Sequence, residues 1–347
     1  MDVRLSPEQV ALRDAAAQAV DRLGATTVAQ FDDAERTAKL DAAIAAAGWR
    51  ELRTPSDDGG PWASAVEVAV IAEELGRGLA DTAFFGPTLA ADLRRRAGAP
   101  LASGGETVAV TADLSKLAIA SSDSAPPDAA AVDARGAVSA LVLFPIDGGW
   151  ALGSIDLGEE VIGADLTRPV ARPTDRGGVE MVLGQTRALD EEDLVRWQSL
   201  GLAIACADLV GTMRGTLALA TDYARNRKQY GAAIGSFQAV QHLLADGLVA
   251  TEGSRSIALH AAWAVDALAP DDALAAASAA KAYCARAARG VCETSIQVHG
   301  GIGTTWECLA HVFLRRALFS IDVLGGVGEN LQRVLAARGI GGDDGFR

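Results

Sequence analysis

The feature that most constrains the fold is a long stretch of helical periodicity that begins near Asp190. The segment EEDLVRWQSLGLAIACADLVGTMRGTLALATDYARNRK repeats its apolar residues with a period close to 3.6 and is not interrupted by proline. The same Ala- and Leu-rich pattern continues to about Arg338. Long helices of this kind pack as a bundle, and their apolar faces often continue into an oligomer interface. Residues 190–347 are therefore expected to form a helical bundle.

The N-terminal region, residues 1–103, also has helical periodicity, from Ser6 to about Ala97. The tetrapeptide SPEQ is the signature of a capping box with proline at the first helical position. Gly48, the turn cluster TPSDDGGP and the Gly86-Pro87 pair interrupt the pattern, which predicts several helices separated by loops.

The middle region, residues 104–189, has a different pattern. Short apolar runs such as TVAVTA, LAIA, SALVLF, WALGS and VEMVLG alternate with Gly, Pro, Asp and Ser. Runs at this spacing are typical of β-strands in a small sandwich or barrel. The chain is therefore expected to be of the α+β class, with helical, β and helical regions in that order.

Composition excludes several classes of function. The formal net charge of −14 argues against nucleic acid or an anionic membrane surface as the main partner, because both require a dense face of Lys and Arg. No run of about 18 uninterrupted apolar residues occurs, so no membrane span is expected. The four cysteines form no CxxC pair and the histidines form no HExxH motif, so no metal site is expected. The charged start MDVRLSPEQ and the cysteine usage predict a cytoplasmic location.

One motif, RKQYG at 227–231, lies where one long helix ends and the next begins. It is followed by IGSFQ at 234–238 and by Gln241-His242. An arginine at a helix end, beside a glycine turn and an aromatic ring, can bind a phosphate with its forked donors. A helix end followed by a capped helix explains the same residues without any ligand.

A second motif, QVHGGIG at 297–303, closes a helix that is expected to begin near Ala269. Glycines here allow a ligand to approach the backbone, whose amides can receive a phosphate or an adenine edge. An ordinary glycine C-cap is the alternative interpretation. The motif does not follow a strand, which argues against a Rossmann fingerprint.

Together, the two motifs closely resemble the C-terminal domain of the flavin-dependent acyl-CoA dehydrogenase family. The second continues as TTWE and LRRA, as in that family, and the GW, EELGR and DLTR segments resemble its other two domains. The resemblance covers nearly the whole chain. It implies a helical N-terminal domain, a small middle β-domain and a C-terminal four-helix bundle, assembled as a dimer of dimers.

The resemblance implies FAD as the cofactor, bound across a dimer interface. In the family, the C-terminal domain of one subunit holds the pyrophosphate and adenosine of the FAD whose ring lies on its neighbour. The residues implied on this side are Arg227 and Gln229 for the pyrophosphate, Phe237 and Gln238 for the adenosine side, and Gln297, Gly300 and Gly301 as a cradle. This half of the site is retained.

The flavin-ring half departs from the family pattern. Family members carry a Thr-Glu-Pro…Gly-Ser-Asp segment and a Lys…Trp-Ile-(Ser/Thr) segment in the β-domain. The corresponding region here reads TADLSKLAIASSDSAPPDAAAVDARGAVSALVLF, and neither segment is present. The β-domain is also shorter than usual, so the flavin-ring contacts are expected to be missing.

The catalytic base is also missing from its usual position. Family enzymes remove the α-proton of the acyl-CoA with a glutamate that follows an Arg-Ala segment and precedes a glycine. Alignment on Arg315-Arg-Ala317 and Gly325 places Leu324 there, and a leucine cannot accept a proton. The alternative base position of some members falls near Gly201-Leu202, again without a carboxylate.

Asp322 is the nearest acidic residue, two positions before Leu324. On a helix this offset rotates a side chain by about 200°, so Asp322 is expected to face away from the site. Asp322 could act as a substitute base only if this loop has a different conformation from that in the family. The alternative is that Asp322 is a solvated or helix-capping residue.

The sequence thus predicts a degenerate subunit of a heteromeric acyl-CoA dehydrogenase that is active only as part of a complex. It resembles the short members that pair with full-length subunits as α₂β₂ in actinobacterial steroid catabolism. The acyl-CoA would lie in the partner's pocket, and the electron acceptor is not indicated. Two alternatives stay open: a self-sufficient homomeric dehydrogenase with a relocated base, and a flavin-free scaffold or binding paralogue.

Overall fold

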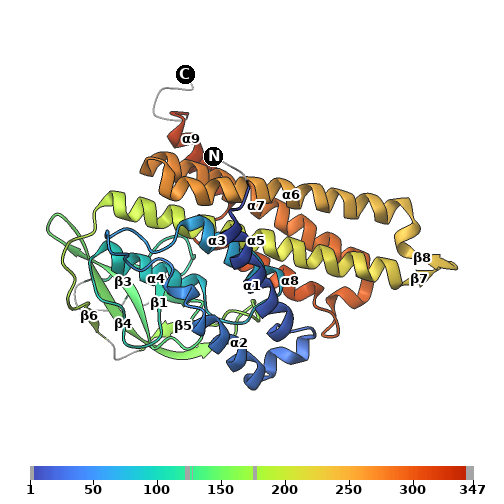
Figure 1. Ribbon diagram of the computed structural model, residues 1–347, viewed down its shortest axis with the longest axis horizontal. Helices are drawn as coiled ribbons and strands as arrows, with labels where there is room; N and C mark the ends of the chain where they lie inside the picture. The colour runs from blue at the N-terminus through green and yellow to red at the C-terminus, as the bar shows by residue number, and fades with distance from the viewer. Residues whose placement is uncertain (1–3, 122–125, 127, 175–177, 341–347) are drawn as a thin grey trace.

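The computed structural model describes residues 4–121, 126, 128–174 and 178–340. Helices, a small sheet and a long helical bundle follow one another along the chain (Figure 1). The predicted fold class, with a helical N-terminal region, a small β region and a helical C-terminal region, is confirmed.

The N-terminal region contains four α-helices that pack against the sheet and the bundle (Figure 1). The predicted capping box is confirmed at the first of them. The Ser6 hydroxyl accepts a hydrogen bond from the Gln9 N–H at 3.2 Å, and the Gln9 side chain accepts one from the Ser6 N–H at 3.0 Å. The helices are α1 (Pro7–Leu23), α2 (Ala34–Ala46), α3 (Ala65–Arg77) and α4 (Phe85–Arg96), with the short 3₁₀ helices η1 (Val28–Asp32) and η2 (Trp49–Glu51).

The middle region is a small barrel. Its strands follow the order β3-β1-β2-β5-β4-β6, and because β3 also pairs with β4, five of them form a closed ring. The interior contains small side chains such as Ala109, Ala131 and Ala140, which suit a narrow barrel. The strands are β1 (Glu106–Val110), β2 (Ala130–Val132), β3 (Ser139–Ile146), β4 (Gly149–Val161), β5 (Val170–Pro173) and β6 (Val179–Met181).

Most of the apolar runs in the sequence predicted the strands. The LAIA run contributes only isolated bridges, in which Leu117 pairs with Val110 and Ile119 with Leu143. Strands β2 and β5 were not predicted, because their sequences AAV and VARP do not stand out as apolar runs of strand length.

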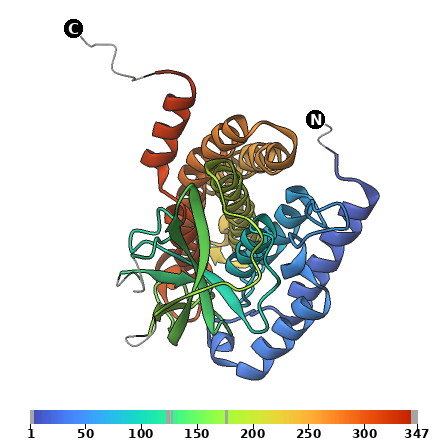
Figure 2. The same cartoon turned by 90° about the vertical axis from the view of Figure 1, so that its left-hand side faces the viewer.

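The C-terminal region is built around α5 (Glu191–Asn226). It packs against α6 (Gln238–Ala267), α7 (Pro270–His299) and α8 (Ala310–Asp322), and α9 (Val327–Ala337) stands out from the bundle near the C-terminus (Figure 2). The helix α5 is long and apolar enough to cross a membrane, but 72% of its most apolar 18-residue segment is buried inside the protein. Its hydropathy is therefore that of a core helix.

A buried ion-pair cluster joins the β region to the bundle, and a 2.9 Å hydrogen bond from Arg316 to the carbonyl of Ala80 links it to the N-terminal region. Asp208 on α5 accepts hydrogen bonds from Arg316 on α8 at 2.6 Å and from Ser320 at 2.6 Å. Arg168, between β4 and β5, lies 3.3 Å from the same carboxylate and 2.7 Å from Asp165. Burial alone would raise the pKa of Asp208, but the two guanidinium groups outweigh it and lower the pKa.

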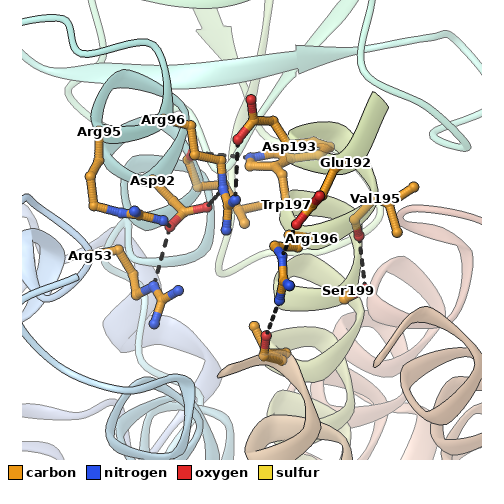
Figure 3. Close-up of polar contacts among 12 residues, drawn as sticks. Arg53, Asp92, Arg95, Arg96, Glu192, Asp193, Val195, Arg196, Trp197 and Ser199 are labelled. Atoms are coloured by element: carbon orange, nitrogen blue, oxygen red, sulfur yellow. Dashed lines mark hydrogen bonds and ion pairs between the residues drawn. The ribbon is translucent and has the colours of Figure 1, made fainter. Parts of the chain in front are cut away.

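A second cluster fastens the N-terminal helices to the bundle (Figure 3). Arg53 contacts Asp92 on α4 at 3.3 Å. It also contacts Asp266 near the end of α6 at 3.0 Å. Arg96 donates to Asp92 at 2.6 Å and lies 3.6 Å from Asp193 at the start of α5. Helices from both ends of the chain are thus held in one orientation.

The first cluster makes the stability of the fold depend on Asp208. Replacing it with asparagine (Asp208→Asn) leaves the buried Arg316 without its charge partner, which costs about 3–5 kcal/mol of unfolding free energy. Urea denaturation of the purified protein measures the loss. The matched control is Glu192→Gln in the exposed pair with Arg196, which should cost less than about 1 kcal/mol. Equal losses in the two variants would contradict a structural role for the cluster.

Candidate functional site

The two sequence motifs meet at one end of the bundle. The ring of Tyr223 on the last turn of α5 stacks on His299 at the end of α7, with 4.5 Å between ring centroids. Ala224 and Val298 form a small buried core beneath this contact, and Ile234 packs against it. The RKQYG and QVHGGIG motifs, which lie about seventy residues apart in the sequence, are therefore neighbours in space.

A two-stranded hairpin projects from this end of the bundle (Figure 1). Its strands are β7 (Lys228–Gln229) and β8 (Ala232–Ala233), joined by Tyr230 and Gly231. Both turn residues have positive φ, 52° and 80°, as a tight type I′ turn requires. The Tyr230 side chain is 96% exposed at the tip. The sequence did not predict the hairpin, because a two-residue strand has no periodicity.

The residues of the RKQYG and IGSFQ motifs lie at the surface of this end. Arg227 is the C-cap of α5, and its exposed guanidinium has no hydrogen bond or ion pair with any residue that the structure describes. Gln229 lies on the hairpin and is exposed. Phe237 caps α6, and its ring lies 6.4 Å from that of Tyr230. Gln238 begins α6 and is exposed.

The QVHGGIG residues form an open surface beside them. Gln297 is exposed on the last turn of α7, and Gly300 follows the helix with φ of +65°. A Cβ atom added to Gly300 or Gly301 would meet no protein atom within 4 Å, so both positions are open to an approaching group. His299 is held by a 2.7 Å contact between its Nδ1 and the carbonyl oxygen of Ser295.

The two expected positions of the catalytic base touch each other. Leu324 is 1% exposed, and a Cβ atom added to Gly201 on α5 would lie only 2.2 Å from its Cδ1 atom. Leu89 on α4 packs against the same point. Apolar side chains thus fill the place where the sequence motifs predict a carboxylate, and none of the described residues at this contact can accept a proton.

The loop that carries Leu324 is held by buried donors. Lys281 on α7 is fully buried and donates to the carbonyl oxygens of Val323 at 2.5 Å and Gly325 at 3.2 Å. Arg333 donates to the carbonyl of Leu324 at 2.9 Å. Burial lowers the pKa of Lys281 to about 8. The sequence does not reveal that this lysine is buried, because a lysine in a helical pattern usually faces solvent.

Asp322 lies at the last position of α8 and is exposed. Its Oδ1 atom would lie 3.7 Å from a Cβ atom added to Gly326, on the side of α9. The buried contact between Leu324 and Gly201 is separate from this exposed carboxylate.

Comparison with known proteins identifies the family. Residues 6–98 match the acyl-CoA dehydrogenase N-terminal domain and residues 201–340 match the acyl-CoA dehydrogenase C-terminal domain. The chain belongs to the acyl-CoA dehydrogenase family. This family is one of oxidoreductases, and the resemblance inferred from the two motifs is confirmed.

Two curated relatives come from Mycobacterium tuberculosis. The acyl-CoA dehydrogenase FadE34 is 32% identical over 85% of this chain, but this chain spans only 41% of its length. The acyl-CoA dehydrogenase IpdE2 is 28% identical, with 83% of this chain and 82% of IpdE2 covered.

Two solved structures share the fold over nearly the whole chain. A variant of the Tcur3481-Tcur3483 steroid ACAD has a TM-score of 0.76 at 22% identity, covering 96% of this chain and 98% of that one. The ChsE4-ChsE5 complex from Mycobacterium tuberculosis has a TM-score of 0.75 at 21% identity, covering 98% and 99%.

FAD is the cofactor of the family, and part of this chain carries groups that suit it. At the hairpin end, an unpaired guanidinium, exposed amide side chains and two open glycines suit a pyrophosphate and its nucleoside. At Leu324, by contrast, buried leucines leave no room for a carboxylate beside a substrate. The residues present therefore fit the adenosine side of the cofactor.

Lys281 should make stability depend on pH. The folded protein releases the lysine proton near pH 8, whereas the unfolded chain holds it to about pH 10.4. Between these values the unfolded state binds more protons, so the unfolding free energy should rise with pH by up to about 1.4 kcal/mol per unit. Lys281→Met should remove this rise, as measured by urea denaturation from pH 7.5 to 9.5.

The control for this experiment is Lys116→Met, which changes an exposed lysine of the β region. Other groups titrate in the same range, so the informative quantity is the slope of the wild type minus that of each variant. A slope that Lys281→Met leaves unchanged would show that the buried amine keeps its proton up to the same pH as an unfolded lysine.

Proposed function

We propose that this chain is the non-catalytic subunit of a heteromeric FAD-dependent acyl-CoA dehydrogenase. It contributes the adenosine and pyrophosphate half of the FAD site to a full-length partner in an α₂β₂ assembly. The partner supplies the flavin-ring contacts, the acyl-CoA pocket and the base. The reaction of the complex is α,β-dehydrogenation of an acyl-CoA, with a steroid-derived acyl group as the proposed substrate class.

The observation that carries this proposal is the contact between Leu324 and Gly201. A base must reach a carbon acid directly, and both positions that could present one are apolar and packed together. A single lost carboxylate could be replaced from the neighbouring position. Here the side chain at one position occupies the space at the other, so this chain offers no proton acceptor there.

The opposite end of the bundle supports a retained role in cofactor binding. The chain carries a net charge of −14, so an anionic cofactor needs locally placed cations. Arg227 is such a cation, and its forked donors can neutralise a pyrophosphate without first leaving another partner. Gln229 and Gln297 add amide donors, and Gly300 allows close approach. When bound, the flavin accepts a hydride from the β-carbon of the acyl-CoA.

The partner is proposed from the solved neighbours. One of them is a complex of ChsE4 with ChsE5, and another is the Tcur3481-Tcur3483 steroid ACAD. A surface that holds only half of a cofactor needs a second chain to complete it. Tyr230, 96% exposed on a hairpin that projects from the bundle, suits contact with such a chain.

Two alternatives differ in what the isolated chain would do. A homomeric enzyme with Asp322 as a relocated base would bind FAD and turn over acyl-CoA by itself. A flavin-free scaffold would bind no FAD in any assembly. The exposed position of Asp322, away from the packed Leu324, supports neither substrate binding nor proton transfer at that carboxylate.

The proposal predicts how much flavin the complex holds. One retained half-site per short chain, combined with one complementary half-site per long chain, gives two FAD per α₂β₂ tetramer. The chain expressed alone should be colourless, and coexpression with its dehydrogenase partner should give a yellow complex. Flavin released by acid and counted against protein measures the ratio. One FAD per chain would favour the homomeric alternative, and no flavin in either preparation would favour the scaffold.

Arg227 tests the retained half-site. Arg227→Ala removes the donors to a partly buried pyrophosphate, so the complex should bind FAD about tenfold more weakly or worse. Flavin fluorescence during dilution of the complex measures the affinity. The matched control is Arg225→Ala, an exposed arginine two residues earlier that faces another side of α5. The Arg225→Ala complex should bind FAD as tightly as the wild type. If the Arg227→Ala complex does so too, Arg227 does not bind the pyrophosphate.

A further inference from the structure

A polar cavity lies where the N-terminal helices meet the barrel. The helices and strands that line it are far from the hairpin end of the bundle (Figure 1). Its volume is about 240 Å³. The walls come from α2, η2, α4, β1 and the turn between β2 and β3. The face of α4 that lines it carries Ala91 and Arg94, whereas Leu89 packs against Leu324 and Gly201. The cavity is therefore separate from the site described above.

Two of the three arginines that line the cavity already have partners. Arg94 makes a two-point contact with Glu106, at 2.6 and 2.7 Å, and donates to the carbonyl of Pro100 at 2.6 Å. Arg50 pairs with Asp41 and donates to the carbonyl of Ala83 at 2.7 Å. The charges within each of these two pairs cancel. The Nη1 atom of Arg50 makes no hydrogen bond with the described residues.

The third arginine, Arg135, has no partner. Its Nε atom is buried, and its guanidinium makes no hydrogen bond or ion pair with any residue that the structure describes. A tight turn closed by a 2.9 Å hydrogen bond from the Ala137 N–H to the Ala134 carbonyl holds Arg135 in place, and Gly136 in this turn has φ of +69°. A buried donor without an acceptor is costly unless a ligand or water supplies one.

The other lining residues indicate the class of ligand. Glu51, exposed in the lining and without an ion pair among the described residues, would repel a doubly charged anion such as phosphate more than a singly charged one. One unpaired guanidinium can neutralise a single negative charge. The remaining wall is apolar and made of small residues, namely Ala83, Pro87, Ala90, Ala91, Leu101 and Ala137.

We propose that this cavity binds a small monocarboxylic acid. The carboxylate accepts hydrogen bonds from Arg135 and from the free Nη1 of Arg50, and a short carbon chain lies against the alanine and proline wall. The proposal does not depend on the FAD half-site or on a partner subunit. It assigns a second ligand to the chain, at the seam between two domains, where binding would hold the barrel against the N-terminal helices.

Titration of the full-length chain with butyrate, followed by ligand-observed NMR and calorimetry, tests the proposal. Butyrate should bind with one site per chain, and Arg135→Gln should weaken binding about tenfold or more, because a charge-assisted pair is lost. Butyramide, which has the same shape without the charge, should bind at least about tenfold more weakly. The matched control is Arg172→Gln, an exposed arginine on β5 outside the cavity, which should bind butyrate as the wild type does.

Three results would overturn the proposal. They are no butyrate binding at tens of millimolar, equal binding of butyrate and butyramide, and binding unchanged by Arg135→Gln. Displacement of butyrate by an equal concentration of inorganic phosphate would overturn the choice of a monocarboxylate. Arg135→Lys, which keeps the charge but loses the fork, should fall between the wild type and Arg135→Gln. Thermal unfolding of each variant establishes that the fold is intact.

Discussion

The buried pairing of Asp208 with Arg316 and Arg168 is the interaction on which the rest of the structure depends. Each of these residues comes from a different segment: the central helix, α8 and the connection between β4 and β5. Buried charges are tolerated only when each finds its partners with good geometry, so the cluster permits few arrangements of the three segments. The barrel and the bundle are thereby placed relative to each other, and the hydrogen bond from Arg316 to the Ala80 carbonyl adds the N-terminal region.

That placement explains how the fold is kept without a carboxylate at position 324. The Leu324 loop keeps its shape because Lys281 and Arg333 bind its carbonyl groups, whichever side chain position 324 carries. Leucine then fills the space against Gly201 and adds apolar packing. The loop is therefore held by buried hydrogen bonds to its backbone. The hairpin end is different, because its exposed residues add little to the packing of the bundle.

The candidate site divides in the same way between what was predicted and what was not. Arg227, Gln229, Phe237, Gln238, Gln297, Gly300 and Gly301 were named from motifs, and all of them lie at the end of the bundle that the motifs implied. Their role toward FAD stays a prediction. Lys281 and the buried Nε atom of Arg135 could not be found from the sequence, because the burial of a charged group is set by its surroundings.

The sequence by itself determined the order of helical, β and helical regions, the capping box at Ser6 and the helix end at Arg227. These features depend on periodicity and on neighbours within a few residues, which the sequence displays directly. Only the tertiary structure decided that Leu324 fills the space beside Gly201, that β1 pairs with β3 and β2 with β5 in the barrel, and that Arg135 faces a cavity. Such contacts join residues that are distant in the chain or set by packing, so no local pattern records them.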